Sequence, residues 1–310
     1  MKKKGAPKKT AESIDPLFKL EQIKRLGIIA MFSDDYLMER LALKGGNAID
    51  LVHKTPCRAS VDLDFSMDSE FEEDLDTIKG KIEKALQITF RAEGFEVFDI
   101  SFTIRPPEHI LSHEMAAFWG GYRVEFKVID SEKYEKWSGN QRDLQVRAVE
   151  VNLPLSQKKV FKIDISKYEY CIPKQRYELD DYTIYAHTPE MIVIEKLRAI
   201  CQQMPEYAEM VKSPSRSARA RDFFDIYMIA EHFKIDLTTA QNIELINNIF
   251  NAKRVPIALI GKIAEYREYH RPDFTAVQAT VRADTDLKDF DFYFDYVLEI
   301  CQSLKILWEK

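Results

Sequence analysis

The chain has 310 residues, of which 45% are hydrophobic and 31% are charged, as expected for a folded globular protein long enough for two domains. No apolar run reaches the ~20 residues of a membrane span, and no apolar segment follows the lysine-rich N-terminus, so we expect a cytoplasmic protein without a secretory signal. The net charge of −6 argues against a dedicated DNA-binding protein but allows an RNA substrate held by a local basic patch.

The first part of the chain combines helical and extended patterns. Residues 1–14 are expected to form a disordered basic tail. Asp15-Pro16 is typical of a helix start, because proline suits the first helical position. From there the apolar spacing predicts helices over 16–31, 34–40, 47–53 and 70–92, and strands over 61–65, 95–104, 122–129, 145–153, 160–165 and 182–185.

The second part of the chain is predicted to be helical. Thr188-Pro189-Glu190 is a strong helix start, and helical spacing continues over 189–203, 216–233, 239–250, 255–267 and 288–309. The sequence therefore predicts an α+β fold, with a mixed β-sheet core flanked by helices and a C-terminal helical bundle. We expect the domain boundaries to give a tail over 1–14, an α/β domain over 15–187 and a helical domain over 188–310.

Two acidic residues lie on the predicted strand over 61–65. Because side chains alternate along a strand, Asp62 and Asp64 share one face, with Cα atoms about 6.6 Å apart, while Val61, Leu63 and Phe65 face a core. Two carboxylates this close repel each other unless a cation lies between them, and Mg²⁺ binds carboxylates together with substrate phosphates. Asp62 and Asp64 are therefore candidate metal ligands, with a solvated surface strand as the alternative.

A glycine pair precedes these acids. Lys44-Gly45-Gly46-Asn47 lies between an apolar strand-like run and a short predicted helix. Adjacent glycines let backbone amides approach a phosphate, and a following helix N-terminus favours an anion. An ordinary turn would have the same residues. However, the order of a glycine pair, a short helix, a loop and then the acid pair on a strand predicts a turn that holds a triphosphate beside its metal.

A third carboxylate could complete the site. Asp164 lies opposite Ile163 on the predicted strand over 160–165. If that strand lies near Asp62 and Asp64, Asp164 is the third ligand of a two-metal site. Glu125, on the strand over 122–129, is the competing third acid, and we favour Asp164.

These motifs resemble a known family. Residues 43–48 (LKGGNA) and 58–65 (RASVDLDF) closely resemble the first motif of the AbiEii/AbiGii toxin nucleotidyltransferases, within the DNA polymerase β-like nucleotidyltransferase superfamily. That motif is a glycine pair, a spacer, an Arg-x-Ser and an acid-x-acid strand. Further on, residues 188–199 resemble the family's lysine helix, and residues 219–227 (RARDFFDIY) its Arg-Asp-x-x-Asp helix. The resemblance covers about residues 20 to 235.

The resemblance implies roles for individual residues. Asp62 and Asp64 would bind the metal, Mg²⁺ or Mn²⁺, and Lys196 would contact the phosphates of a nucleoside triphosphate. Asp222 would support the site. The remaining nucleotide-binding candidates come from the first motif and are Lys44, Gly45, Gly46, Asn47, Arg58 and Ser60. The superfamily often has Gly-Ser where this chain has Gly46-Asn47, so here a backbone or amide group would replace the hydroxyl.

The helical motifs also have a structural interpretation. Lys196 lies among apolar residues, and a buried ammonium needs an anionic partner. A triphosphate would serve, and so would Asp222 or Asp225, which are three residues apart and share one helical face. A lysine–aspartate bridge between two helices is therefore an alternative to a phosphate contact.

The resemblance implies a function as well. It predicts an enzyme that transfers a nucleotide from a nucleoside triphosphate to an acceptor hydroxyl, favouring a tRNA 3′ end. The protein would act as the toxin of a bacterial toxin–antitoxin or phage-defence system, with a cognate antitoxin as partner. The alternatives are modification of a small molecule or a protein hydroxyl, and a non-catalytic relative that binds a nucleotide or a protein.

Overall fold

The computed structural model describes residues 16–55, 60, 62–107, 109, 112–150, 158–211, 216–281 and 285–309. The predicted tail over 1–14 and the candidate residue Arg58 lie outside these ranges.

A mixed β-sheet forms the centre of the molecule. In the described part of the chain, seven strands pair in the order β3-β4-β5-β2-β1-β7-β6. The pairs β1–β7 and β2–β5 are parallel and the others are antiparallel. The strands are β1 (Ala42–Lys44), β2 (Leu63–Ser66), β3 (Phe95–Arg105), β4 (Gly121–Asp130), β5 (Phe161–Ser166), β6 (Gln175–Leu179) and β7 (Tyr182–Ala186).

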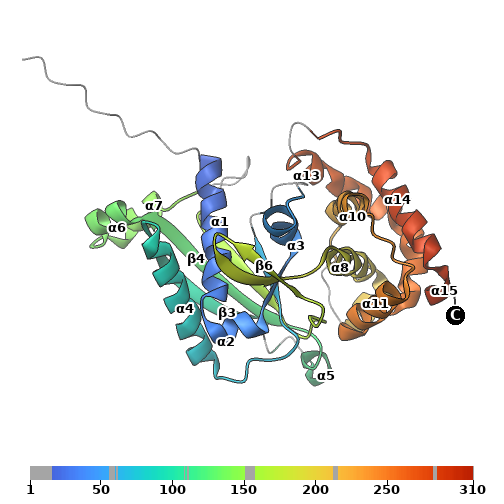
Figure 1. The fold of residues 1–310 in the computed structure, drawn as a ribbon, viewed down its shortest axis with the longest axis horizontal. Helices are drawn as coiled ribbons and strands as arrows, with labels where there is room; N and C mark the ends of the chain where they lie inside the picture. The colour runs from blue at the N-terminus through green and yellow to red at the C-terminus, as the bar shows by residue number, and fades with distance from the viewer. Residues whose placement is uncertain are drawn as a thin grey trace, which may run out of the picture.

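One face of the sheet is covered by α1 (Pro16–Phe32) and α4 (Leu75–Ala92), which pack side by side (Figure 1). The ring centroids of Phe32 and Phe65 lie 5.8 Å apart, which joins α1 to β2. Asp74 caps α4 by accepting a hydrogen bond from the Thr77 amide. The smaller helices of this part are α2 (Asp35–Arg40), α3 (Gly45–Asn47), which continues as a π-helical turn over Ala48–Val52, α5 (His113–Ala116), α6 (Ser131–Trp137) and α7 (Gln141–Arg147).

The chain after β7 is helical and lies to one side of the sheet (Figure 1). Helices α10 and α14 share an aromatic core, in which Phe223 and Phe294 stack with centroids 4.9 Å apart. The elements are α8 (Pro189–Cys201), α9 (Pro205–Val211), α10 (Ala220–Phe233), α11 (Ala240–Ala252), a 3₁₀ helix (Ile257–Tyr266), α12 (Arg267–His270), a 3₁₀ turn (Arg271–Asp273), α13 (Phe274–Gln278), α14 (Phe290–Ser303) and α15 (Lys305–Trp308).

This architecture confirms the predicted α+β fold class. The main cluster of buried residues runs from Leu20 to Leu304, so the sheet and the later helices pack into one core. The division into domains at residues 187 and 188 stays a prediction. None of the described helices is long and apolar enough to cross a membrane.

One predicted element is wrong. Residues 145–153 alternate like a strand, but residues 141–147 form α7. Asn140 starts this helix, because its side chain accepts hydrogen bonds from the amides of Arg142 and Asp143 at 3.1 and 3.3 Å. Residues 151–153 lie outside the described ranges. Strand β6 and the short helices α5, α6, α9, α12 and α13 were not predicted as separate elements.

Candidate active site

Four charged residues form a row across the sheet. Lys44 on β1 pairs with Asp64 on β2, Asp64 pairs with Asp164 on β5, and Asp164 pairs with Arg123 on β4. Directly paired residues project from the same face of a sheet. The row therefore places two carboxylates side by side between two cations.

The predicted alternation around Asp64 is confirmed within the described residues. Leu63 and Phe65 are buried, whereas Asp64 faces the opposite side. The strand begins later than predicted, at Leu63, so Asp62 lies immediately before it and is exposed. The backbone carbonyl of Asp62 accepts a hydrogen bond of 2.7 Å from the Asn47 side chain. Because Asn47 is fully buried, this hydrogen bond fixes the position of the Asp62 backbone.

The glycine pair packs against Asp64 and Ser60 without room for side chains. Gly45 has a φ of +68°, and a Cβ there would lie 2.7 Å from Oδ2 of Asp64. A Cβ on Gly46 would lie 2.7 Å from Cβ of Ser60. Only glycine lets the backbone approach the carboxylate this closely.

A cavity of about 800 Å³ brings the candidate residues together. It opens between the charged face of the sheet and the helices α8 and α10. Of the residues proposed from sequence, its walls contain Lys44, Gly45, Gly46, Ser60, Asp62, Asp64, Asp164, Lys196 and Asp222. Asn47 and Glu125 are not among the lining residues. Glu125 instead pairs with Lys162, and their charged groups lie 4.0 Å apart.

Lys196 joins two helices at the far wall of the cavity. Its ammonium lies 3.0 Å from Asp222 Oδ1 and 2.6 Å from Asp225 Oδ2, and all three side chains are buried. Arg219 Nη1 lies 3.3 Å from the other oxygen of Asp222. The lysine–aspartate bridge predicted as the structural alternative is therefore present, and Lys196 and Asp222 also line the cavity.

The carboxylates on the sheet can accept a cation. Burial raises the pKa of Asp64 to about 7; Lys44 opposes this rise, and Asp164 and Asp62 add to it. Arg123 holds Asp164 by two hydrogen bonds of 2.7 and 3.0 Å. Within the described residues, no three His, Cys, Asp or Glu side chains by themselves form a metal cluster. The carboxylate oxygens of Asp64 and Asp164 are the donor type that a hard cation takes together with phosphate and water oxygens.

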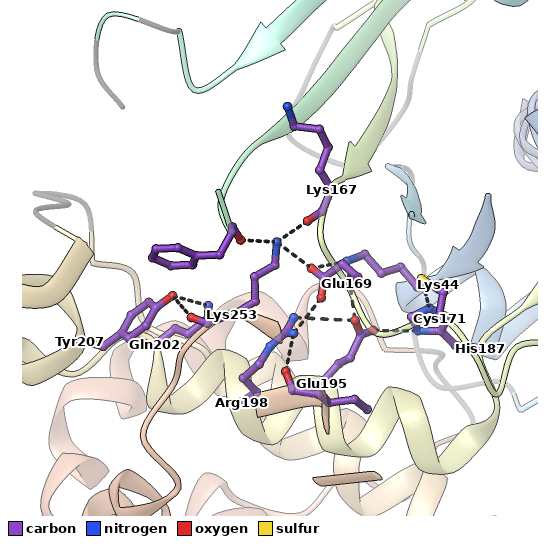
Figure 2. Close-up of polar contacts among 12 residues, drawn as sticks. Lys44, Lys167, Glu169, Cys171, His187, Glu195, Arg198, Gln202, Tyr207 and Lys253 are labelled. Carbon is purple, nitrogen blue, oxygen red and sulfur yellow. Dashed lines mark hydrogen bonds and ion pairs between the residues drawn. The ribbon is translucent and has the colours of Figure 1, made fainter. Parts of the chain in front are cut away.

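A group of charged residues that lines the cavity was missed from sequence, apart from Lys44. We call Lys44, Glu169, Glu195, Arg198 and Lys253 the lysine–glutamate cluster. Figure 2 shows Lys44, Arg198 and Lys253 converging on Glu169. Glu195 lies 3.7 Å from both Lys44 and Arg198, and its other oxygen lies 3.0 Å from the Nδ1 atom of His187.

The cations keep both glutamates of this cluster ionised. Burial alone would raise the pKa of each carboxyl group, but Arg198, Lys253 and Lys44 hold the pKa of Glu169 well below its ordinary value. Lys44 and His187 lower the pKa of Glu195 to about 2 in the same way. Glu195 and Arg198 lie within the stretch that resembles the lysine helix, which was a signal for them. Lys253 and Glu169 have no such signal.

Several solved structures are similar to this chain at low sequence identity. JHP933 from Helicobacter pylori is 15% identical with a TM-score of 0.46, and the match covers 96% of this chain and 95% of that one. MenT4, a nucleotidyltransferase toxin from Mycobacterium tuberculosis, is 14% identical with a TM-score of 0.43, covering 93% and 83%. An antigenic nucleotidyltransferase-like protein from Paracoccidioides brasiliensis is 13% identical with a TM-score of 0.36, covering 85% and 95%.

Comparison with curated proteins gives no significant match. The model of one protein family, described as nucleotidyl transferase AbiEii toxin of type IV toxin–antitoxin systems, matches residues 28–296, which include the charged row and the lysine helix. The chain therefore belongs to the AbiEii family of nucleotidyltransferase toxins.

Proposed function

We propose that this enzyme transfers a nucleoside monophosphate from a nucleoside triphosphate to the 3′-terminal hydroxyl of a tRNA. The observation that carries the proposal is the pairing of Asp64 with Asp164 on adjacent parallel strands, next to a glycine turn that lines the cavity. The acceptor hydroxyl gives up its proton to solvent and its oxygen forms a bond to the α-phosphorus. The bond from the α-phosphorus to the oxygen that bridges to the β-phosphorus breaks, and pyrophosphate leaves.

The residues have separate tasks in this reaction. Gly45 and Gly46 let the triphosphate approach the carboxylates. Asp62, Asp64 and Asp164 would hold Mg²⁺ or Mn²⁺, which when bound neutralises charge on the α-phosphate and makes the acceptor hydroxyl more acidic. Lys196 stabilises the phosphates by contacting them while Asp222 and Asp225 keep its ammonium in place.

Basic residues at the cavity support a nucleic-acid acceptor. Arg105, Arg219 and Arg221 line it, although the chain as a whole carries a charge of −6. A local group of arginines beside a carboxylate site is suited to the phosphates of an RNA end. We propose that the protein acts in the cytoplasm as a toxin, with an antitoxin as its partner and phage defence as its role.

The test incubates the purified protein with total tRNA, Mg²⁺ and each α-³²P-labelled nucleoside triphosphate in turn. The double variant Asp62→Ala/Asp64→Ala is treated in parallel. The proposal predicts label on tRNA with at least one triphosphate and none with the double variant. No label with any triphosphate would remove tRNA as the acceptor, and protein and small-molecule acceptors would then be tested.

The toxin role has its own test. Expression of the wild-type chain is expected to arrest bacterial growth, and Asp64→Ala is expected to relieve the arrest at an equal protein level. Arrest that persists in Asp64→Ala would separate toxicity from nucleotidyl transfer.

A further inference from the structure

The lysine–glutamate cluster carries more positive than negative charge. Within the cluster, three cations, Lys44, Arg198 and Lys253, face two carboxylates, Glu169 and Glu195. Outside the cluster, Asp64 of the charged row also attracts Lys44. All five residues line the cavity, and Glu169, Arg198 and Lys253 are buried. Placing excess charge away from water is costly unless a counter-ion completes the group. An anion that enters the cavity can supply that charge.

The two lysines of the cluster are held differently. In the described part of the chain, the Lys44 ammonium donates one hydrogen bond, to Glu169 at 3.4 Å, and lies 3.7 Å from Glu195. Both distances exceed the ~2.8 Å of a strong charge-assisted hydrogen bond. Lys253 donates to the backbone carbonyls of Phe118 and Lys167 and lies 3.6 Å from Glu169. Two backbone carbonyls therefore hold the Lys253 ammonium in addition to Glu169, whereas Lys44 has only long contacts with carboxylates.

The two lysines also compete for the same oxygen atom. Arg198 binds Oε2 of Glu169 at 2.7 Å, which leaves Oε1 for both Lys44 and Lys253. Because Lys253 shares Oε1, Glu169 cannot fully neutralise Lys44. Lys44 directly precedes the glycine turn and is paired with Asp64, so its ammonium lies beside the proposed path of the triphosphate.

We propose that Lys253 is a positioning residue, which by sharing Glu169 leaves the Lys44 ammonium available to bind the pyrophosphate end of a nucleoside triphosphate. This inference rests on the proposed nucleotidyl transfer. It assigns a task to the end of α11, a part of the chain in which the sequence shows no motif. Lys253 acts through Glu169 and Lys44 rather than by touching the substrate.

The test measures the affinity for magnesium pyrophosphate by calorimetry, without any acceptor. Lys253→Met lets Glu169 pair fully with Lys44, so the affinity is expected to fall about tenfold, the effect of losing one charged hydrogen bond. Glu169→Gln releases Lys44 and is expected to keep or increase the affinity. Lys253→Arg keeps the charge and should retain binding. Lys262→Met, which removes a half-exposed lysine paired with Glu206 outside the cluster, is the control for net charge.

The opposite changes in affinity expected for Lys253→Met and Glu169→Gln distinguish a positioning role of Lys253 from a purely structural one. If Lys253 and Glu169 only hold the sheet to α11, both substitutions weaken binding alike, and that result overturns the inference. Unchanged affinity in Lys253→Met also overturns it. If Lys253→Met does not fold, Glu169→Gln decides, because weaker binding in that variant contradicts the inference. A wild-type protein that binds no pyrophosphate contradicts both the inference and the proposed function.

Steady-state kinetics provide a second test of the same inference. In the transfer reaction, Lys253→Met is expected to raise KM for the nucleoside triphosphate about tenfold while kcat changes little, because Lys44 contacts phosphates already in the ground state. A fall in kcat without a change in KM would contradict this assignment.

Discussion

Adding a single carbon at Gly45 tests whether the glycine turn must lie close to Asp64. A Cβ there would lie 2.7 Å from Asp64 Oδ2 on a backbone with positive φ. Gly45→Ala is expected to displace the Asp64 carboxylate and lower kcat at least about tenfold, with a loss of roughly 1–2 kcal/mol in the free energy of unfolding. Initial rates and calorimetry measure the two effects.

Gly80 provides the matched control. It lies in α4, and a Cβ there meets nothing within 4 Å. Gly80→Ala should leave activity unchanged and stabilise the helix by about 0.5–1 kcal/mol. Full activity in Gly45→Ala would show that the turn does not need its close approach to Asp64.

His270 is a buried residue that links the C-terminal helices to the start of α10. Its Nδ1 atom accepts a hydrogen bond of 3.0 Å from the Arg219 amide, which requires this nitrogen to be unprotonated. Burial lowers the pKa of His270 to about 4; Asp222 opposes this, while Arg219 and Arg216 add to it. The geometry and the pKa both describe a neutral imidazole.

This neutral imidazole predicts a pH-dependent stability. The folded-state pKa of about 4 lies below the unfolded value of 6.5, so the unfolded state binds the proton first as the pH falls. The contribution of His270 is complete above pH 6.5 and is lost between pH 6.5 and 4, by up to about 3 kcal/mol. Chemical unfolding across this range should show a shallower pH dependence in His270→Asn, which keeps an acceptor but does not titrate. An identical pH dependence in both proteins would rule out this role.

At the scale of elements, Lys196 connects α8 to α10 and lines the cavity, so its two roles can be separated. Lys196→Met removes the cation that Asp222 and Asp225 share, although Asp222 keeps its contact with Arg219, and should lower the free energy of unfolding by about 3 kcal/mol. Lys196→Met/Asp225→Asn should recover part of that stability, because one charge is removed. If Lys196 also binds phosphates, the double variant stays inactive. Recovered activity would show that Lys196 only connects the two helices. Urea unfolding and transfer rates measure both.

Local sequence patterns predicted the elements that carry the site, because each of these elements is specified by residues close together in the sequence. The glycine turn, the strand with Asp64 and the helix with Lys196 each depend on a few adjacent residues. The strand predicted over 145–153 was wrong because alternation in polarity also fits a short exposed helix, and the Asn140 cap decided the outcome.

At the scale of the whole molecule, contacts between distant residues were beyond local patterns. Asp164 was proposed as the third acid, but the parallel pairing that places it beside Asp64 joins strands about a hundred residues apart. Arg123 was not anticipated as its partner. The cluster around Glu169 depends on the end of α11 reaching the sheet, and Lys253 in sequence is an ordinary charged residue after a helix. The burial of Glu169 and Lys253, which makes their pairing important, follows from the fold and is not visible in the local sequence.

If the charged row across the sheet carries the reaction, its carboxylates Asp64 and Asp164 are both required for nucleotide transfer. The most direct measurement compares the rate of nucleotide transfer in Asp164→Asn and Glu125→Gln, two isosteric substitutions on neighbouring strands. We predict that Asp164→Asn lowers kcat about a hundredfold or more, whereas Glu125→Gln stays within about threefold of the wild type. A near-normal rate in Asp164→Asn together with a large loss in Glu125→Gln would show that Glu125, and not Asp164, is the third acid of the site.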